Sequence, residues 1–393
     1  MSTIDPDVPV LPLLESDELR AVRAAVREIC ERFGHGYWRE THERGESPDA
    51  LWQALSEGGF IGVNVPEEWG GGGLGMQGLI TVGEELAAYG FNMLLLVVSP
   101  AINGSILARH GTTEQKERWL RGVAAGTTRI AFAITEPDAG TNSHNLRTSL
   151  RREGGKLLLK GQKTYISGVE QADQVLVVAR GVNEDGSLGL PSLCIVDVDA
   201  PGFTRDRIPM PYLGPDHQWT LFFDDVEIDE DRLVGGFNGG LGPIFDGLNP
   251  ERIIGAALAC GGGRLALEKA SAYARERQVW KTPIGAHQGV AHPLAKAKID
   301  LDLAWLMTQK AAALYDAGAQ AGEAANMAKY AAAEAGIACV DRGMQTLGGN
   351  GLSIEYGMSD LWWGARLART APVSAEMVLN YVAEHSLGLP KSY

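Results

Sequence analysis

The spacing of apolar residues changes twice along this chain, and this change restricts the folds that it can adopt. From residue 16 to about residue 126 the spacing is three to four, the period of one face of a helix. The first such run occupies five positions: Leu19, Val22, Val26, Ile29 and Phe33. Ser16 precedes it as a possible N-cap and Gly34 follows it as a stop. Further helices are predicted over residues 48–57, 79–88 and 114–123, with a glycine-rich connector at residues 70–75.

The middle of the chain has a different pattern. Short runs rich in Val, Ile, Leu and Phe cover residues 129–135, 156–160, 174–180, 193–198 and 220–228. Turn signals separate them, such as Asp185-Gly186. Because no helical pattern lies between these runs, a mostly antiparallel sheet is predicted rather than a parallel one.

From about residue 241 the helical spacing returns in three long stripes, around residues 254–265, 294–305 and 330–347. Long helices with one apolar stripe are typical of antiparallel bundles. The sequence therefore predicts an α+β fold in three parts: an N-terminal helical domain (1–128), a β-sheet domain (129–240) and a C-terminal helical bundle, a four-helix bundle, over residues 241–393.

Composition excludes several classes of protein. The chain has 393 residues and a net charge of −14, which argues against nucleic-acid binding because that needs a basic face. No apolar run approaches the ~18 residues of a membrane span. The first twelve residues lack the basic start of a signal peptide, so we expect a cytoplasmic protein. The four cysteines lie far apart without metal-ligand spacing, so we expect no metal and reduced, buried thiols.

Four segments carry candidate chemistry. They are Ala131-Phe-Ala-Ile-Thr-Glu-Pro-Asp-Ala-Gly-Thr141, Lys160-Gly-Gln-Lys-Thr-Tyr-Ile-Ser167, Tyr273-Ala-Arg-Glu-Arg-Gln-Val-Trp-Lys281 and Gln345-Thr-Leu-Gly-Gly-Asn-Gly351. Each has a plain interpretation alone: a strand and turn, a strand with a core aromatic, a basic helix end, and a glycine helix cap. Together, and in this order of helices, sheet and helices, they resemble the acyl-CoA dehydrogenase family over nearly the whole chain.

The resemblance implies FAD as the cofactor. It places these residues at the flavin dinucleotide: Phe132, Ile134, Thr135, Thr141, Tyr165, Ser167, Arg277, Trp280, Gln288, Gln345, Gly348, Gly349, Ser374 and Glu376. Tyr165 stands where the family more often has Trp. The segments with Arg277 and Gly348 serve the FAD of a neighbouring subunit in that family, so the resemblance implies a homo-oligomer, usually a tetramer.

The resemblance also selects a catalytic base. The family places its glutamate at one of two positions, and the commoner one is Pro372 in this chain. The other, used by isovaleryl-type and long-chain-type members, is Glu251, followed by Arg252. Glu251 is therefore expected to take the α-proton of an acyl thioester, with Arg252 orienting or screening it. A shifted register would instead make Glu376 the base.

Two features of these segments leave alternatives open. Asn249, Pro250 and Glu251 are also typical of the start of a helix, where an N-cap, a proline and an acid are common. Pro372 lacks the N–H that in the family polarises the thioester carbonyl. The N–H of Val373 and a ribityl hydroxyl of the flavin are the candidates to replace it.

Three functions are compatible with these segments. The first is an FAD-dependent dehydrogenase that converts an acyl-CoA, or an acyl-carrier-protein thioester, to the trans-2-enoyl product and passes electrons to an electron-transfer flavoprotein. The second is a flavin-dependent oxidase or monooxygenase on the same fold, against which Glu251 argues. The third is a non-catalytic thioester-binding protein, against which the intact flavin segments argue. The position of the base favours short or branched acyl chains, although long-chain enzymes share it.

Overall fold

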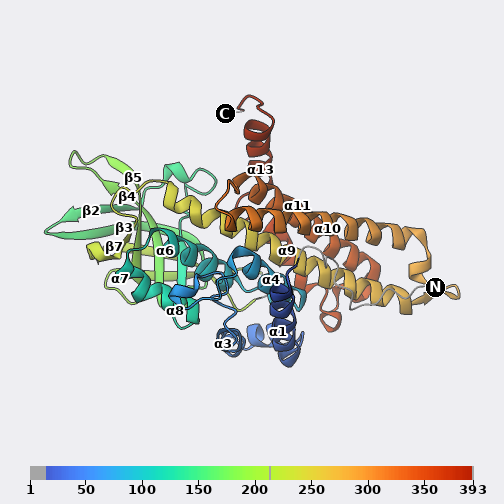
Figure 1. Ribbon diagram of the computed structural model, residues 1–393. Coiled ribbons are helices and arrows are strands. Elements are labelled where there is room, and N and C mark those ends of the chain that lie inside the picture. Colours follow the sequence, from blue (N-terminus) through green and yellow to red (C-terminus); the bar gives the residue numbers. More distant parts are fainter. Residues whose placement is uncertain (1–14, 212–213, 392–393) are drawn as a thin grey trace.

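The computed structural model describes residues 15–211 and 214–391 and has the predicted order of helices, sheet and helices, so the predicted fold class is confirmed (Figure 1). The N-terminal helices are α1 (Asp17–Phe33), α2 (Tyr37–Glu43), α3 (Asp49–Glu57), α4 (Gly75–Ala88), α5 (Leu94–Leu96), α6 (Ser105–His110), α7 (Thr113–Gln115) and α8 (Arg121–Ala125). As predicted, Ser16 caps α1: the N–H of Leu19 donates to its Oγ at 3.2 Å, and Gly34 ends the helix with a positive φ of 73°.

The sheet follows, with β1 (Ile130–Ala133), β2 (Ser149–Glu153), β3 (Lys156–Ser167), β4 (Gln174–Val182), β5 (Leu188–Asp197), β6 (Phe203–Ile208), β7 (Gln218–Ile228) and β8 (Leu233–Val234). Their order is β6-β7-β3-β2-β4-β5-β8, with β1 also paired to β4. Most pairs are antiparallel as predicted, but β1 and β2 both run parallel to β4.

The loop that contains the second half of the first motif lies between these two parallel strand pairs. Along β4, Ala133 of β1 pairs with Val177, and Ser149 of β2 pairs with Arg180, so the two strands follow each other along β4. Residues 134–148 therefore leave the sheet and return to it within a few positions of one strand. A parallel connection made by a loop has no helical signature, which is why the sequence pattern did not predict it.

Both faces of the sheet are buried. Along β4, Leu176 and Val178 belong to the main core, which continues into the helices, whereas Val175 and Val177 belong to a second core on the other face. This alternation is the two-residue period of a strand. All four cysteines are buried and free, as predicted. Within the described residues, no helix is both long and apolar enough to cross a membrane.

The C-terminal part contains α9 (Gly242–Glu276), the short strands β9 (Gln278–Val279) and β10 (Thr282–Pro283), α10 (Gln288–Asp316), α11 (Gly322–Leu347), α12 (Asp360–Ala368) and α13 (Ala375–Tyr381). In Figure 1, α9, α10 and α11 extend side by side away from the sheet, and α9 also packs on α4 of the N-terminal part. Helix α9, which belongs to the C-terminal part, thus also contacts the N-terminal helices.

The interpretation of Asn249 and Pro250 as a helix start is wrong. Helix α9 begins at Gly242, so Pro250 lies inside it. A proline there removes the N–H that would bond the carbonyl four residues earlier, which belongs to Asp246. The hydroxyl of Tyr315 on α10 donates to that carbonyl at 2.9 Å and replaces the missing bond. Because Glu251 does not lie in a first turn, capping does not explain it.

A group of charged side chains joins α9 to α1 and α4. Arg264 of α9 donates to Glu84 and to Glu85 at 2.7 Å each, and Arg23 of α1 contacts both carboxylates. Burial alone would raise the pKa of Glu84, but Arg264 and Arg23 outweigh it and lower the pKa to about 2. The folded chain therefore favours the ionised form of Glu84.

We predict that Glu84→Gln lowers the free energy of unfolding by about 3 kcal/mol at pH 7. The folded pKa of Glu84, about 2, lies below the ordinary value of 4.5, so this stabilisation is present above pH 4.5 and is lost as the pH falls toward 2. Thermal unfolding midpoints of the variant and the wild type should therefore converge on acidification. Glu28→Gln, at an exposed position of α1, is the control; a Glu84→Gln deficit that does not change with pH would contradict the prediction.

Candidate active site

Glu251 lies in α9 with a carboxylate that is partly buried and has no hydrogen bond to any residue in the described ranges. Burial raises its pKa to about 7, and the nearby charge of Arg252 opposes this increase only in part. A carboxyl group with this pKa is half ionised near neutral pH and can accept a proton. Such a shift is typical of a functional acid or base rather than of a structural ion pair.

Arg252 turns toward its own helix. Its Nη1 donates to the carbonyl of Leu248 at 3.0 Å and to Oδ1 of Asn249 at 3.4 Å, and its buried Nε has no partner in the described part of the chain. Arg252 therefore does not form a salt bridge with Glu251. It acts on the Glu251 carboxylate through its charge alone.

The two positions at which the family places its base lie close together, at one face of α9. Gly255 follows Glu251 by four residues, which is about one helical turn. A Cβ atom added to Gly255 would lie 4.0 Å from Cδ of Pro372. Pro372 therefore lies next to the Glu251 face, in the connection between α12 and α13. This arrangement supports the register in which Pro372, and not Glu376, occupies the commoner position.

The other two predicted residues near Pro372 lie at the start of α13. Ser374 is its N-cap, and its Oγ accepts a hydrogen bond from the N–H of Met377 at 3.3 Å. Glu376 lies in the first turn and is exposed to solvent. Its exposure offers none of the burial that raises the pKa of Glu251.

The loop of residues 134–148 is held by a buried ion pair. Lys163 of β3 is fully buried, and its Nζ lies 2.9 Å from both Oε1 of Glu136 and the carbonyl of Ile134. The same carboxylate accepts the N–H groups of Arg147 at 2.7 Å and Thr148 at 2.9 Å. Burial alone would raise the pKa of Glu136, but Lys163 and these donors hold it below its ordinary value.

Neither Glu136 nor Lys163 was among the residues singled out by sequence, although both lie in motifs that were. A signal was present, because a lysine at an inward position of an apolar strand needs a buried partner. Among the predicted residues of this loop and of β1, Phe132 is buried in the main core, Ile134 and Thr135 are partly exposed, and Thr141 is exposed.

Tyr165 is presented to solvent by an irregular stretch of β3. The register between β3 and β7 shifts between Lys163 and Ile166, and Tyr165 has a φ of 57°. Its side chain is 59% exposed, so the alternative that it packs in the sheet core is wrong. A left-handed backbone costs a tyrosine about 1–3 kcal/mol, which is typical of functional sites. Close by, Ser167 exchanges hydrogen bonds with the side-chain amide of Gln218 at 2.9 and 3.1 Å.

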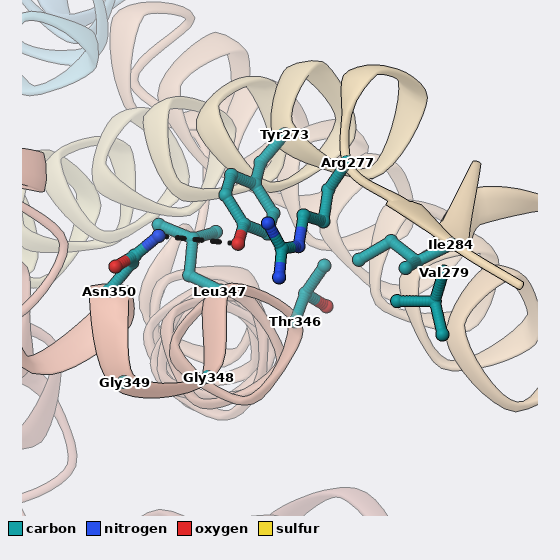
Figure 2. Close-up of a pocket in the computed structure, with 9 residues that line it drawn as sticks. All are labelled: Tyr273, Arg277, Val279, Ile284, Thr346, Leu347, Gly348, Gly349 and Asn350. Carbon is teal, nitrogen blue, oxygen red and sulfur yellow. Dashed lines mark hydrogen bonds between the residues drawn. The ribbon is translucent and has the colours of Figure 1, made fainter.

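A separate cavity of about 480 Å³ lies at the far end of α9 (Figure 2). It is lined by Tyr273, Arg277, Val279, Ile284, Thr346, Leu347, Gly348, Gly349 and Asn350. The guanidinium of Arg277 has no hydrogen bond or ion pair within the described ranges. A Cβ atom added to Gly348 or Gly349 would meet nothing within 4 Å, so the backbone there is open to a ligand.

The remaining predicted residues surround this end of the molecule. Trp280 is 88% exposed at the turn between β9 and β10, where it and Lys281 both have positive φ, as in a two-residue hairpin of type I′. Gln288, the first residue of α10, and Gln345, in the last turn of α11, are exposed and do not line the cavity.

The predicted site residues therefore form two groups at opposite ends of α9. Glu251 and Arg277 are separated by 26 residues along one helix, or ~39 Å at 1.5 Å per residue. This is more than one dinucleotide can span. The residues of each group nevertheless suit a flavin dinucleotide: Tyr165 offers an exposed ring near the sheet, and Arg277 with two open glycines offers a phosphate site.

Family comparisons cover most of the chain. Residues 16–127 match the description "Acyl-CoA dehydrogenase, N-terminal domain", residues 131–226 the "middle domain" and residues 238–387 the "C-terminal domain" of the same family. The chain is also 53% identical over 382 residues to the acyl-CoA dehydrogenase FadE12 of Mycobacterium tuberculosis, which covers 97% of this chain and 98% of that protein.

Solved structures agree with these matches. Butyryl-CoA dehydrogenase from Megasphaera elsdenii superposes with a TM-score of 0.90 at 25% identity, covering 95% of this chain and 99% of that one. Glutaryl-CoA dehydrogenase from Mycobacterium smegmatis in complex with FADH2 superposes with a TM-score of 0.88 at 25% identity, covering 97% of each chain. Both similarities extend over the helical parts and the sheet.

We predict that Lys163→Met weakens flavin binding. Removal of the ammonium group leaves the buried carboxylate of Glu136 without its charge partner, which typically costs about 3–5 kcal/mol. The loop that begins at Ile134 should loosen, and the purified variant should contain less FAD and unfold at a lower temperature. Lys160→Met is the matched control, because Lys160 lies on the same strand but is exposed. Equal FAD content in Lys163→Met and wild type would refute this role of the ion pair.

Proposed function

Because the chain belongs to the acyl-CoA dehydrogenase family, and is accordingly an FAD-dependent oxidoreductase that acts on acyl-CoA, we propose that Glu251 is the base that starts the reaction. The observation that carries this proposal is the state of its carboxylate. It is partly buried, has no hydrogen bond to a described residue and has a pKa that burial raises to about 7. No such group occurs at the other family position, where the chain has Pro372.

The reaction removes two hydrogens from neighbouring carbons. Glu251 takes the α-hydrogen as a proton, and the electrons of that C–H bond form the new double bond between the α- and β-carbons. FAD, when bound, accepts the β-hydrogen with its electron pair. The product is the trans-2-enoyl thioester, and Glu251 holds the proton until it passes to solvent. Arg252 limits the rise of the Glu251 pKa, so that the base is ionised in a useful fraction of molecules near pH 7.

On the sheet side, the residues that would hold the flavin ring are those of β1, β3 and the loop between β1 and β2. Ile134 and Thr135 follow β1, and the N–H of Thr164 donates to the carbonyl of Thr135 at 2.9 Å, which fixes the loop beside Tyr165. Tyr165 would cover one face of the ring, with Phe132 behind it. Ser167 would offer a hydroxyl to a ring nitrogen, and Thr141 would reach phosphate.

A second copy of the chain completes the site in this proposal. The ~39 Å between Glu251 and Arg277 prevents one chain from using both groups on one flavin. Arg277, Trp280, Gln288, Gln345 and the two open glycines would therefore hold the dinucleotide of a neighbouring subunit. We propose a homo-oligomer, a tetramer by family resemblance, in which each flavin site contains residues of two chains.

The substrate and the electron acceptor are proposed as chemical classes. The position of the base favours a short or branched acyl chain on coenzyme A, with an acyl-carrier-protein thioester as the other possible carrier. An electron-transfer flavoprotein would reoxidise the reduced flavin. Anaerobic addition of a series of acyl-CoA chain lengths, followed by flavin absorbance, would identify the chain class by the thioester that bleaches the flavin.

We predict that Glu251→Gln keeps FAD and the oligomer but reduces flavin reduction by acyl-CoA at least 100-fold, because an amide cannot accept the α-proton. In the wild type, the rate of flavin reduction should rise with pH through about 7 and then level off, because only the ionised carboxylate is a base. Stopped-flow absorbance under anaerobic conditions measures both effects.

Glu323→Gln, at an exposed position in the first turn of α11, is the matched control for this variant. Near-wild-type reduction in Glu251→Gln would refute the assignment. Loss of reduction in Glu376→Gln instead would transfer the base to Glu376. Rapid oxygen consumption by the reduced wild type would favour an oxidase.

We predict that Arg277→Ala lowers the FAD content of the purified protein, whereas Arg275→Ala, in the last turn of the same helix, does not. Co-expression of Arg277→Ala with Glu251→Gln should then restore activity above that of either variant alone. In a mixed pair, the subunit with intact Glu251 receives its Arg277 from the other chain. Full FAD retention in Arg277→Ala, or no gain on mixing, would show that Arg277 does not complete a neighbour's site.

A further inference from the structure

Lys329 is a buried lysine that the reaction described above does not use. It lies in the first half of α11 and is only 2% exposed. Burial, and to a lesser extent the charge of Arg252, lower its pKa to about 8. Placing an ammonium group in this position costs free energy that an apolar side chain would not. The lysine is therefore expected to have a specific partner.

That partner is a backbone carbonyl in the turn that packs against α9 at Gly255. Nζ of Lys329 donates to the carbonyl oxygen of Val373, in the connection between α12 and α13. A second tie holds the same connection to α11, since Nε of Arg369 donates to Glu334 at 2.7 Å. The N–H of Ala375 closes the connection by donating to the carbonyl of Arg369 at 3.1 Å. Residues 369–375 are thus attached to α11 at two points.

The connection carries a backbone donor without a partner among the described residues and packs against α9 at Gly255. Pro372 lies against Gly255, one helical turn beyond Glu251 on α9. Pro372 has no N–H, so the next backbone donor is that of Val373. Within the described ranges, the N–H of Val373 makes no hydrogen bond, whereas its carbonyl is held by Lys329. Val373 is half-buried as a residue, and a backbone N–H without a protein partner at such a position suggests that a ligand atom accepts from it.

We propose that Lys329 is a positioning residue that holds the Pro372–Val373 turn beside Glu251, so that the N–H of Val373 donates a hydrogen bond to the thioester carbonyl of the substrate. The inference rests on the proposed function. As Glu251 removes the α-proton, negative charge grows on the thioester oxygen, and a fixed donor stabilises that charge most in the transition state. Loss of one such donor in other enzymes costs about 100- to 1,000-fold in rate, and a displaced donor should cost less.

The test compares Lys329→Met with Lys298→Met. Lys298 lies on α10, is exposed and pairs only with Asp302 one turn away, so its variant removes the same charge without touching the turn. Lys329→Met should lower the limiting rate of flavin reduction by roughly 10- to 100-fold, while the dissociation constant for acyl-CoA from the same titration changes less than about threefold. Lys329→Arg should recover part of the rate, and Lys298→Met should match the wild type.

A second measurement does not depend on turnover. A 3-thia-acyl-CoA has an acidified α-proton but no β-hydrogen, so Glu251 can form its enolate without reduction of the flavin. At one fixed pH, Lys329→Met should form a smaller fraction of enolate than the wild type, read from its long-wavelength absorbance. Val373→Pro removes the N–H and leaves Lys329 intact, so it should form the same smaller fraction of enolate. This variant replaces Lys329→Met in the measurement if Lys329→Met does not fold.

Each outcome decides the proposal. Wild-type rate and wild-type enolate fraction in Lys329→Met would overturn it. Parallel losses of FAD, thermal stability and substrate affinity with an unchanged enolate fraction would show a structural role only, and would also overturn it. Failure of the proposed function is recognised separately, because Glu251→Gln would then still form the enolate, whatever Lys329→Met does.

Discussion

Helix α9 continues through Pro250, and both Glu251 and Arg277 take their positions from it. A proline inside a helix leaves a carbonyl without its partner, and Tyr315 of α10 supplies the missing hydrogen bond to Asp246. The helix therefore extends from the sheet to the far end of the bundle. It carries Glu251 near one end and Arg277 at the other, too far apart to serve one cofactor. In the proposed function, this separation is the reason why a second copy of the chain completes each flavin site.

Buried charges fall into two kinds in this molecule. Glu84 and Glu136 each have cationic or N–H partners that hold the pKa below its ordinary value, so they fix one segment against another. Glu251 has burial without a hydrogen bond, and its pKa is raised. The lack of hydrogen-bonding partners among the described residues, and not burial, distinguishes the proposed base from the two structural carboxylates, because Glu84 is buried as well. Lys329 has features of both kinds. Like Glu84 and Glu136 it has a hydrogen-bond partner, and like Glu251 it has a pKa that burial shifts toward the neutral form.

Much of the architecture followed from local pattern. The change from a helical period to short strands and back predicted the order of the elements, and Ser16 capped α1 as expected. Where local pattern failed, a distant partner was responsible. The Asn249-Pro250 pair resembles a helix start until α10 provides the hydroxyl that repairs the helix. Parallel pairing with β4 has no signature in β1 or β2 themselves, since register depends on strands far away in sequence.

The amino-acid order alone specifies which chemical groups are present: a glutamate at one family position, a proline at the other, and the segments that resemble flavin sites. These are covalent facts that no packing alters. Which groups are buried, which are paired and which share a surface depends on how the chain folds. Folding brought Pro372 beside the Glu251 face, attached Val373 to Lys329 and gave Glu136 its buried partner. Burial and distance arise from contacts between remote segments, and they set the pKa and the reach of each group.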